Sequence, residues 1–137
     1  EGLEWVIISG NLGVEQWTAE VVHDLKKDYP ELKLGILYPF LDFGSQWKEN
    51  NQEKKSQVES FADFIESVSH HPYESFHQLK NHTQFLLQHT DAALLVYDSE
   101  YPGKTKYLYE DILRYQEKND YFLSTISFDD LQNYEEW

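Results

Sequence analysis

The chain alternates short apolar runs with stretches in which apolar residues recur at helical spacing. The apolar runs are bounded by turn residues, a pattern typical of strands in a parallel sheet that is covered on both faces. They predict strands at residues 4–9, 34–38, 92–97 and 121–126, with a short extended piece at 66–69. The run at 92–97 is wholly apolar, which predicts a central strand.

Helices are predicted between these strands, because apolar residues there recur three and four positions apart. The first helix spans residues 14–28 and ends before Pro30, a polar loop from Asp42 leads into the second, and the third spans residues 76–88. The predicted buried stripes contain Val14, Trp17, Val21, Val22 and Leu25, then Val58, Phe61, Ala62 and Ile65, then Phe76, Leu79, Phe85 and Leu86, and in a fourth helix Leu108, Ile112 and Tyr115. This alternation predicts an α/β fold with an open, mostly parallel sheet.

The sharpest boundary between the two patterns is the loop Gly10-Asn11-Leu12-Gly13. The first strand stops at Gly10, and the first helix begins just after Gly13. Glycine adopts backbone angles that other residues resist, and the free N–H groups of a helix N-terminus attract anions. The loop therefore has the geometry of a nucleotide site. A tight connection without a ligand is the alternative, because the spacing does not match the dinucleotide-binding fingerprint.

Glu15 opens the first helix, where the helix dipole favours a carboxylate. Its charge would repel a phosphate seated at the same place. A sugar hydroxyl, a base or water is therefore the better ligand for this side chain.

A second glycine loop follows the apolar strand at 92–97. Gly103, Lys104 and Thr105 resemble the end of an NTPase phosphate loop, but Asp98 occupies the position of the earlier glycine that this motif needs. Gly103 and Thr105 can instead cap the next helix or hold a phosphate. Because ligands of open α/β sheets bind beyond the carboxyl ends of strands, two glycine loops at such ends favour a nucleotide pocket.

Other residue types give weaker indications. Tyr38, Tyr73 and Tyr97 lie at or near predicted element ends and can stack on a base, although an aromatic residue beside a sheet is more often part of the core. The histidines between residues 70 and 89 lack the three- or four-residue helical spacing of a metal site. No nucleophile, base and orienting group can be assembled into a catalytic triad.

Composition and charge restrict the partners. The net charge of −14, from 25 acidic and 11 basic side chains, opposes a nucleic-acid interface and disfavours an anionic membrane surface. The length of 137 residues with 40% hydrophobic content predicts one domain over residues 1–137. The absence of cysteine and of any apolar run long enough to span a membrane favours a cytoplasmic protein. The opening residues, Glu1-Gly2-Leu3-Glu4, and the lack of methionine predict that an N-terminal piece is missing.

Several segments together resemble the YpsA family, a Rossmann-like family of the SLOG superfamily. The superfamily also contains the DNA-processing protein DprA and the LOG nucleoside-monophosphate phosphoribohydrolases. The matching residues are Ile8-Ser9-Gly10-Asn11-Leu12-Gly13-Val14-Glu15, Trp17, Ala19-Glu20, His71-Pro72-Tyr73-Glu74-Ser75, Leu94-Leu95-Val96-Tyr97-Asp98, Lys106-Tyr107 and Asp129-Asp130-Leu131, so the resemblance covers essentially the whole chain.

The resemblance implies a Rossmann-like sheet with helices on both faces and a pocket for a nucleotide, NAD or an ADP-ribose-like ligand. It also implies an association with cell division in Gram-positive bacteria, without an established reaction. The family has a further strand before the point where this sequence begins, placed between the strands predicted at 4–9 and 92–97. We therefore expect a gap there, filled by residues outside this sequence or by another chain, as in a homo-oligomer. Direct pairing of those two strands would contradict the expected gap.

The enzymes among the relatives offer an alternative function. Pro102, Gly103 and Glu110 match the spacing of the phosphoribohydrolase motif. Lys104, Lys106 and Tyr107 replace two glycines and a threonine of that motif. Because the backbone nest is lost, hydrolysis of a nucleotide glycosidic bond, with Glu15 or Glu110 as general acid/base, ranks second.

The favoured hypothesis is a nucleotide- or nucleotide-sugar-binding regulatory protein with little or no catalysis and a cell-division protein as candidate partner. A DprA-like DNA-binding function ranks below both because of the charge. A ligand-free interaction module that uses exposed aromatic residues such as Trp47 and Trp137 is the remaining alternative. No metal ligand is predicted. The predicted ligand-binding residues are Gly10, Asn11, Gly13, Val14, Glu15, Tyr73, Tyr97, Asp98, Gly103 and Thr105.

Overall fold

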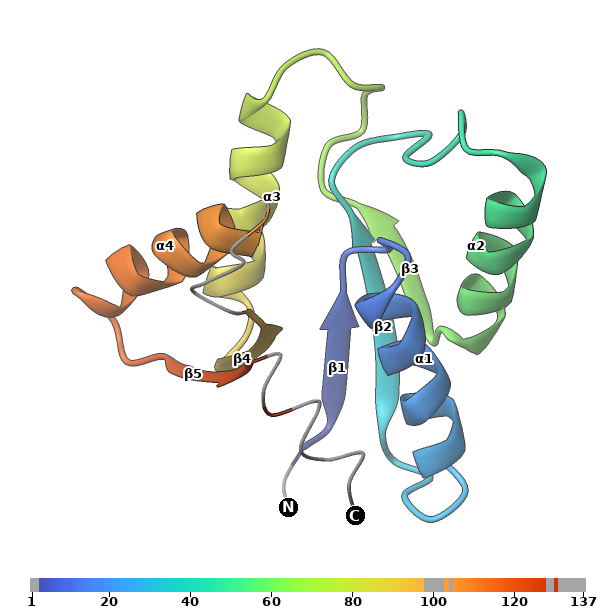
Figure 1. Cartoon of the computed structure of the whole chain (residues 1–137), viewed down its shortest axis with the longest axis horizontal. Helices are drawn as coiled ribbons and strands as arrows, with labels where there is room; N and C mark the ends of the chain where they lie inside the picture. Colours follow the sequence, from blue (N-terminus) through green and yellow to red (C-terminus); the bar gives the residue numbers. More distant parts are fainter. Residues whose placement is uncertain (1–2, 98–102, 104, 128–129, 131–137) are drawn as a thin grey trace. The chain divides into compact units, whose positions relative to one another are not determined.

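Strands and helices alternate along the chain in the computed structural model, which describes residues 3–97, 103, 105–127 and 130. The chain forms two compact units, Glu1–His82 and Thr83–Trp137. Every strand pairing among the described residues is parallel. This alternation of helices with parallel strands is that of an open Rossmann-like α/β fold, so the predicted fold class is confirmed (Figure 1).

The elements follow the predicted order. The first unit contains β1 (Trp5–Ile8), α1 (Val14–Leu25), β2 (Lys33–Tyr38), α2 (Glu49–Phe61) and β3 (Phe64–Ser67). The helix α3 (His77–Gln88) has residues in both units. The second unit continues with β4 (Ala92–Val96), α4 (Thr105–Gln116) and β5 (Phe122–Ile126).

The first unit is built on a sheet of order β1-β2-β3. In this sheet β2 is central, with Ile36 opposite Ile8 on one side and opposite Ile65 on the other. All residues of β2 except Lys33 are buried, as the apolar run of this strand predicts. The carboxyl ends of all three parallel strands therefore lie at one edge of the sheet, where the loops that follow β1, β2 and β3 begin.

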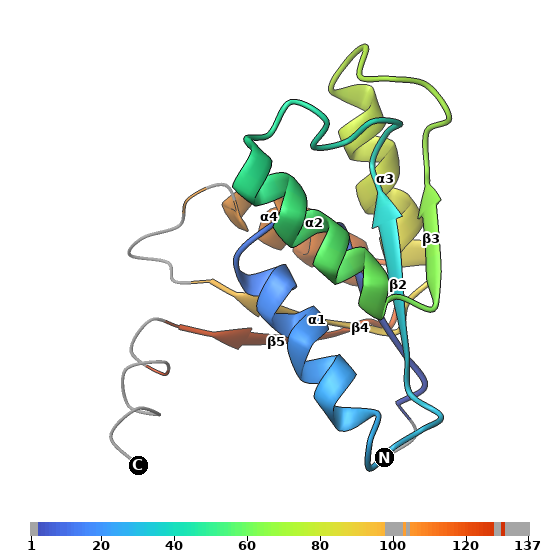
Figure 2. The same ribbon diagram turned by 90° about the vertical axis from the view of Figure 1, so that its right-hand side faces the viewer.

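One face of this sheet is covered by α1 and α2, which lie side by side (Figures 1 and 2). Alternate residues of β2 face these helices and form the core with residues of β1, α1 and α2. The buried members of this cluster are Ile8, Ala19, Val22, Leu32, Leu34, Ile36, Tyr38 and Val58.

The predicted apolar stripe of α1 is wrong in all but one residue. Ala19 and Val22 are buried at 0% and 3% exposure, whereas Trp17 and Val21 are 62% and 55% exposed. The helix turns Ala19 and Val22 toward the core, and Trp17 and Val21 lie on a different face. Regular spacing identified the helix but not the side that the sheet covers.

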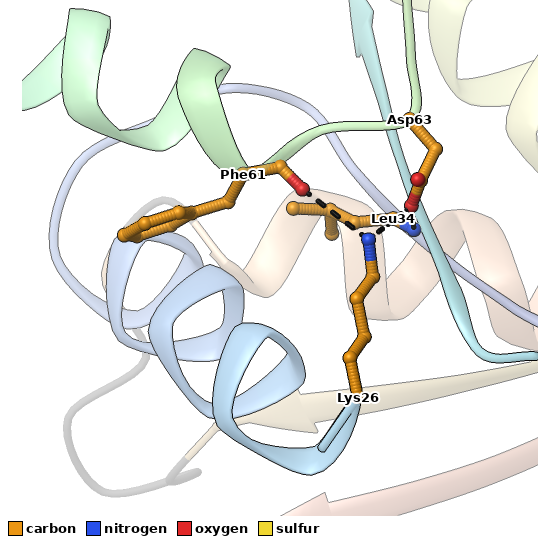
Figure 3. A network of polar contacts seen from close by, with 4 residues as sticks. All are labelled: Lys26, Leu34, Phe61 and Asp63. Carbon is orange, nitrogen blue, oxygen red and sulfur yellow. Dashed lines mark hydrogen bonds and ion pairs between the residues drawn. The ribbon is translucent and has the colours of Figure 1, made fainter. Parts of the chain in front are cut away.

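The end of α2 also differs from the prediction, because Ile65 lies in β3 and not in the helix. Ala62 has extended backbone angles and ends α2. The next residue, Asp63, accepts the Leu34 N–H at 2.9 Å and forms an ion pair with Lys26 at the end of α1. Lys26 Nζ also lies 3.5 Å from the Phe61 carbonyl oxygen, so this network joins α1, β2 and the end of α2 (Figure 3).

The helix α3 buries other residues than its predicted stripe. Phe76, Leu79 and Phe85 are 54%, 42% and 37% exposed, whereas His82 and Leu87 are buried. His82 Nε2 donates to the Leu37 carbonyl of β2 at 2.6 Å, which fixes the proton-bearing nitrogen of the ring. Burial lowers the pKa of His82, so the side chain is neutral near pH 7.

The second unit contains a two-stranded sheet of β4 and β5. The described part of the chain does not show the predicted central position of residues 92–97, since β4 pairs there with β5 alone and Leu94 is 65% exposed. Nor does β4 pair with β1 there, because the two strands belong to separate sheets. The expected gap between them stays a prediction, as does the single domain over residues 1–137. Within the described residues no helix is long and apolar enough to cross a membrane.

The Asp63 network gives a testable contribution to stability. We expect Asp63→Asn to lower the free energy of unfolding by about 0.5–1 kcal/mol, the range of a solvent-screened ion pair. Lys26 holds the pKa of Asp63 below its ordinary value, so the difference should vanish as the pH falls through that lowered pKa. Urea denaturation measures it. Asp28→Asn, at an exposed site just past α1, is the matched control, and an equal loss in the two variants would contradict the assignment.

Candidate functional site

The loop between β1 and α1 is shaped by two glycines with left-handed backbone angles. Gly10 has φ of +89° and Gly13 has φ of +88°, which side chains rarely allow. Gly13 is the N-cap of α1, and its carbonyl accepts the Trp17 N–H at 3.0 Å, so the helix starts at once after the loop. The sharp turn brings the first helical turn back over the end of β1.

The Glu15 side chain fills the space inside this loop. Its Oε2 accepts the Ser9 N–H at 2.7 Å, and its Oε1 accepts the Asn11 N–H at 3.0 Å. The loop amides that a phosphate would use are therefore partly occupied by a carboxylate of the protein itself. This arrangement explains why the backbone can turn so tightly without leaving these two donors unpaired.

Each carboxylate oxygen has two lone pairs, so Glu15 can accept further hydrogen bonds beside those from Ser9 and Asn11. Burial raises the pKa of Glu15 above the ordinary 4.5, and the two backbone donors oppose part of that shift. The site thus offers an acceptor for the hydroxyl or N–H groups of a ligand, at the carboxyl end of a parallel strand. It offers much less to a phosphate.

The Tyr38 side chain lies between this loop and the loop that follows β2. Its hydroxyl donates to Glu59 Oε2 at 2.6 Å, and the Lys55 ammonium lies 5.0 Å from the ring centroid. Burial and the bond to Glu59 raise the pKa of Tyr38, so the phenol keeps its proton. A Cβ at position 10 would lie 2.6 Å from Tyr38 Cδ1, so only glycine fits there.

Aromatic rings gather next to Tyr38, beyond the ends of β2 and β3. Phe43 packs on Tyr38 with ring centroids 5.7 Å apart, and Trp47 meets Phe43 edge-on at 5.6 Å. Tyr73 packs on Phe40 at 5.2 Å. Sequence reasoning selected only Tyr73 for the ligand-binding set. For Phe40 and Phe43 the available signal was the run Pro39-Phe40-Leu41-Asp42-Phe43 directly after a buried strand.

The predicted site residues fall into two groups. Gly10, Asn11, Gly13, Val14 and Glu15 share one loop and helix start in the first unit, which also contains Tyr73. In the second unit, Tyr97 stacks on Tyr109 with centroids 4.4 Å apart, Gly103 has φ of +54°, and Thr105 and Glu110 belong to α4. Asp98 lies outside the described residues, as do Pro102 and Lys104. The described residues contain no group of three or more acidic, histidine or cysteine residues arranged to hold a metal ion.

Comparison with known families identifies the chain. A model of the YpsA family, described as the YspA SLOG family, matches residues 1–131. The chain belongs to this family. The resemblance that the sequence motifs indicate is thereby confirmed.

Relatives named UPF0398 protein are similar to this YpsA family member over almost its whole length. The protein of Enterococcus faecalis is 58% identical over 132 residues, which cover 96% of this chain and 73% of the relative. The Leuconostoc citreum protein is 53% identical, with 97% and 70% covered, and the Ligilactobacillus salivarius protein is 51% identical, with 99% and 74% covered.

Alanine at the two loop glycines should separate backbone strain from steric overlap. Gly13→Ala meets open space, so it should cost only the strain of its backbone angles, about 1–3 kcal/mol. Gly10→Ala adds an overlap with the Tyr38 ring and should cost about 1–3 kcal/mol more. Chemical denaturation of both variants measures the difference. Equal losses would mean that Tyr38 does not wall the loop.

The raised pKa of Glu15 predicts a pH dependence of stability. Since the folded state holds this proton more tightly than the unfolded state, the stabilisation is fully present below about pH 4.5 and is lost as the pH rises through the raised value. The free energy of unfolding of the wild type should therefore decline relative to Glu15→Gln between these limits. Urea titrations at several pH values measure this. The same profile relative to Glu31→Gln, at an exposed turn, would exclude Glu15 as its source.

Proposed function

We propose that this chain binds a nucleotide or a nucleotide sugar at the carboxyl edge of β1 and β2 and acts as a regulatory protein rather than as an enzyme. The observation that carries the proposal is the Glu15 carboxylate, held inside a glycine loop by the N–H groups of Ser9 and Asn11. Ligands of open α/β sheets bind at this edge. Membership of a SLOG family supports the same ligand class.

The polarity of the loop decides which part of the ligand it meets. Glu15 is an acceptor that already neutralises two loop amides, so a vicinal pair of sugar hydroxyls suits it, and a phosphate does not. The phosphate then lies outward, toward Gly13, where a Cβ would meet open space. This assignment reverses the usual use of a glycine loop and agrees with the acidic charge of the chain, −14.

The physiological role is inferred from the family resemblance. The motifs shared with the YpsA family support a link to cell division, with a cell-division protein as the partner that responds to the bound nucleotide. In this proposal the concentration of the ligand reflects a metabolic state. Binding of the ligand changes the interaction with the partner, and the ligand is not chemically converted.

Glycosidic-bond hydrolysis is the second candidate, and one observation favours it. Burial raises the pKa of Glu15, which is the direction of shift that a carboxylic general acid requires. Against it, Glu15 is hydrogen-bonded through both oxygens, and Glu110, the other candidate, belongs to the second unit.

Thermal-shift measurements test the proposal. The wild type should be stabilised in a saturable way by one of the nucleoside mono- or diphosphates, NAD or ADP-ribose, by about 5–10 °C at a ligand concentration 100 times Kd. Glu15→Gln should weaken that binding by at least about tenfold, because a charged acceptor is lost. Glu31→Gln is the matched control and should bind like the wild type.

Equal binding by Glu15→Gln and Glu31→Gln would exclude the glycine loop as the sugar site. Chromatography of the incubated ligand separates the two functions. Release of the free base by the wild type but not by Glu15→Gln would replace the regulatory role with hydrolysis.

A further inference from the structure

A hollow of about 580 Å³ opens beyond the carboxyl ends of β2 and β3. It is lined by the loop of residues 40–47 and by Pro72 and Tyr73. Small-molecule sites typically measure about 300–1,000 Å³, so the hollow is large enough for a heterocycle with its substituents. Neither the glycine loop nor Glu15 contributes to its lining, which makes it a separate feature of the first unit.

The walls of the hollow are aromatic rings set at steep angles. Phe40 and Trp47 stand at 69° and 77° to the ring of Phe43, and Tyr73 stands at 58° to Phe40. Tyr73 is 54% exposed at the rim. Flat π-faces that are left partly open to solvent are suited to stacking on another planar ring.

The loops that carry these rings are held in place by two glutamines. From α2, Gln52 Nε2 donates to the carbonyls of Gly44 and Trp47 at 2.7 and 3.3 Å. From α3, Gln78 Nε2 donates to Ser69 Oγ at 2.9 Å and to the Pro72 carbonyl at 3.0 Å. The Leu41 N–H donates to the His71 carbonyl at 3.0 Å and joins the two walls. A hollow built in this way exists before a ligand arrives, which lowers the entropy cost of binding.

The charge of the lining excludes one part of a nucleotide and attracts another. Among the described residues that line the hollow, Asp42 is the charged one, and it is acidic. A phosphate would be repelled here. A ring that carries an amino group would gain a charge-assisted hydrogen bond to the carboxylate. Asp42 also has φ of +59°, a left-handed conformation that holds the residue in the loop bend.

We propose that this hollow binds the purine base of the ligand, with the ring stacked on Tyr73 and Trp47 and an exocyclic amino group donating to Asp42. The inference rests on the proposed function for its sugar site. Tyr38 contacts both places, since its ring abuts Gly10 and also packs on Phe43. The proposal assigns the base of a nucleoside to the hollow and its ribose to Glu15.

Stacking is tested by saturation-transfer NMR and calorimetry with adenosine as the probe. The base protons should receive more saturation than the ribose protons. Tyr73→Ala should weaken binding about 5- to 100-fold, the loss expected for one stacked ring. Tyr29→Ala removes a tyrosine that is 63% exposed beyond the end of α1 and should leave the affinity unchanged. Equal affinities of the two variants would overturn the inference.

The amino group is tested by comparing adenosine with purine riboside, which lacks it. The wild type should prefer adenosine by about tenfold. Asp42→Gly, which the left-handed backbone accepts without strain, should remove that preference and leave purine riboside binding intact. Equal binding of both nucleosides by the wild type would exclude Asp42 as the acceptor.

Two further experimental outcomes distinguish a failure of this inference from a failure of the proposed function. If ribose 5-phosphate binding is lost in Glu15→Gln but adenosine binding is unchanged in Tyr73→Ala, the sugar site stands and the base site is overturned. If adenosine does not bind and Tyr73→Ala instead abolishes a concentration-dependent self-association in sedimentation experiments, the hollow is a protein interface, which also overturns the inference.

Discussion

The close approach of the Tyr38 ring to Gly10 is the contact on which the candidate site depends. The ring stands where a side chain at position 10 would project, and its hydroxyl is fixed by Glu59 of α2. The conformation of the glycine loop is therefore set from the neighbouring strand and the helix that follows it. The same ring packs on Phe43, which is part of the aromatic hollow. One tyrosine at the end of the central strand thus ties two loops, distant in sequence, to the same packed core.

The electrostatics of the site are set by the Glu15 carboxylate, an anion of the protein itself that binds the loop amides. Glycine loops before helices commonly receive a ligand's phosphate, whereas here Glu15 takes up the amides of Ser9 and Asn11. A chain with a net charge of −14 gains little from recognising an anion. Recognition through hydroxyl groups, a planar ring and an amino group is compatible with that charge, because none of these groups is negative. The proposed ligand is therefore one that the protein recognises through its neutral groups, whereas the net negative charge opposes polyanions.

The sequence predicts the elements well and their buried sides less well. The strand β2 was predictable because its apolar run fills the centre of a sheet, and the glycine loop was predictable because Gly10 and Gly13 interrupt two clear periodicities. The stripe of α1 was not, since Trp17, Val21 and Leu25 recur at helical spacing just as Ala19 and Val22 do, and only the packing of α1 against the sheet selects between the two sets. The aromatic hollow could not be predicted from the sequence for a similar reason. Its rings come from two loops that only tertiary structure brings together, and a polar segment surrounds Trp47.

The helix α3 connects the outer wall of the hollow to the core of the first unit. Gln78, which holds the loop of Ser69 and Pro72, and His82, which is bonded to the Leu37 carbonyl, both lie on this helix. The same helix continues past the boundary at Thr83 into the second unit. Within the first unit, the outer wall of the hollow and the backbone of the central strand β2 are therefore held by the same turns of one helix.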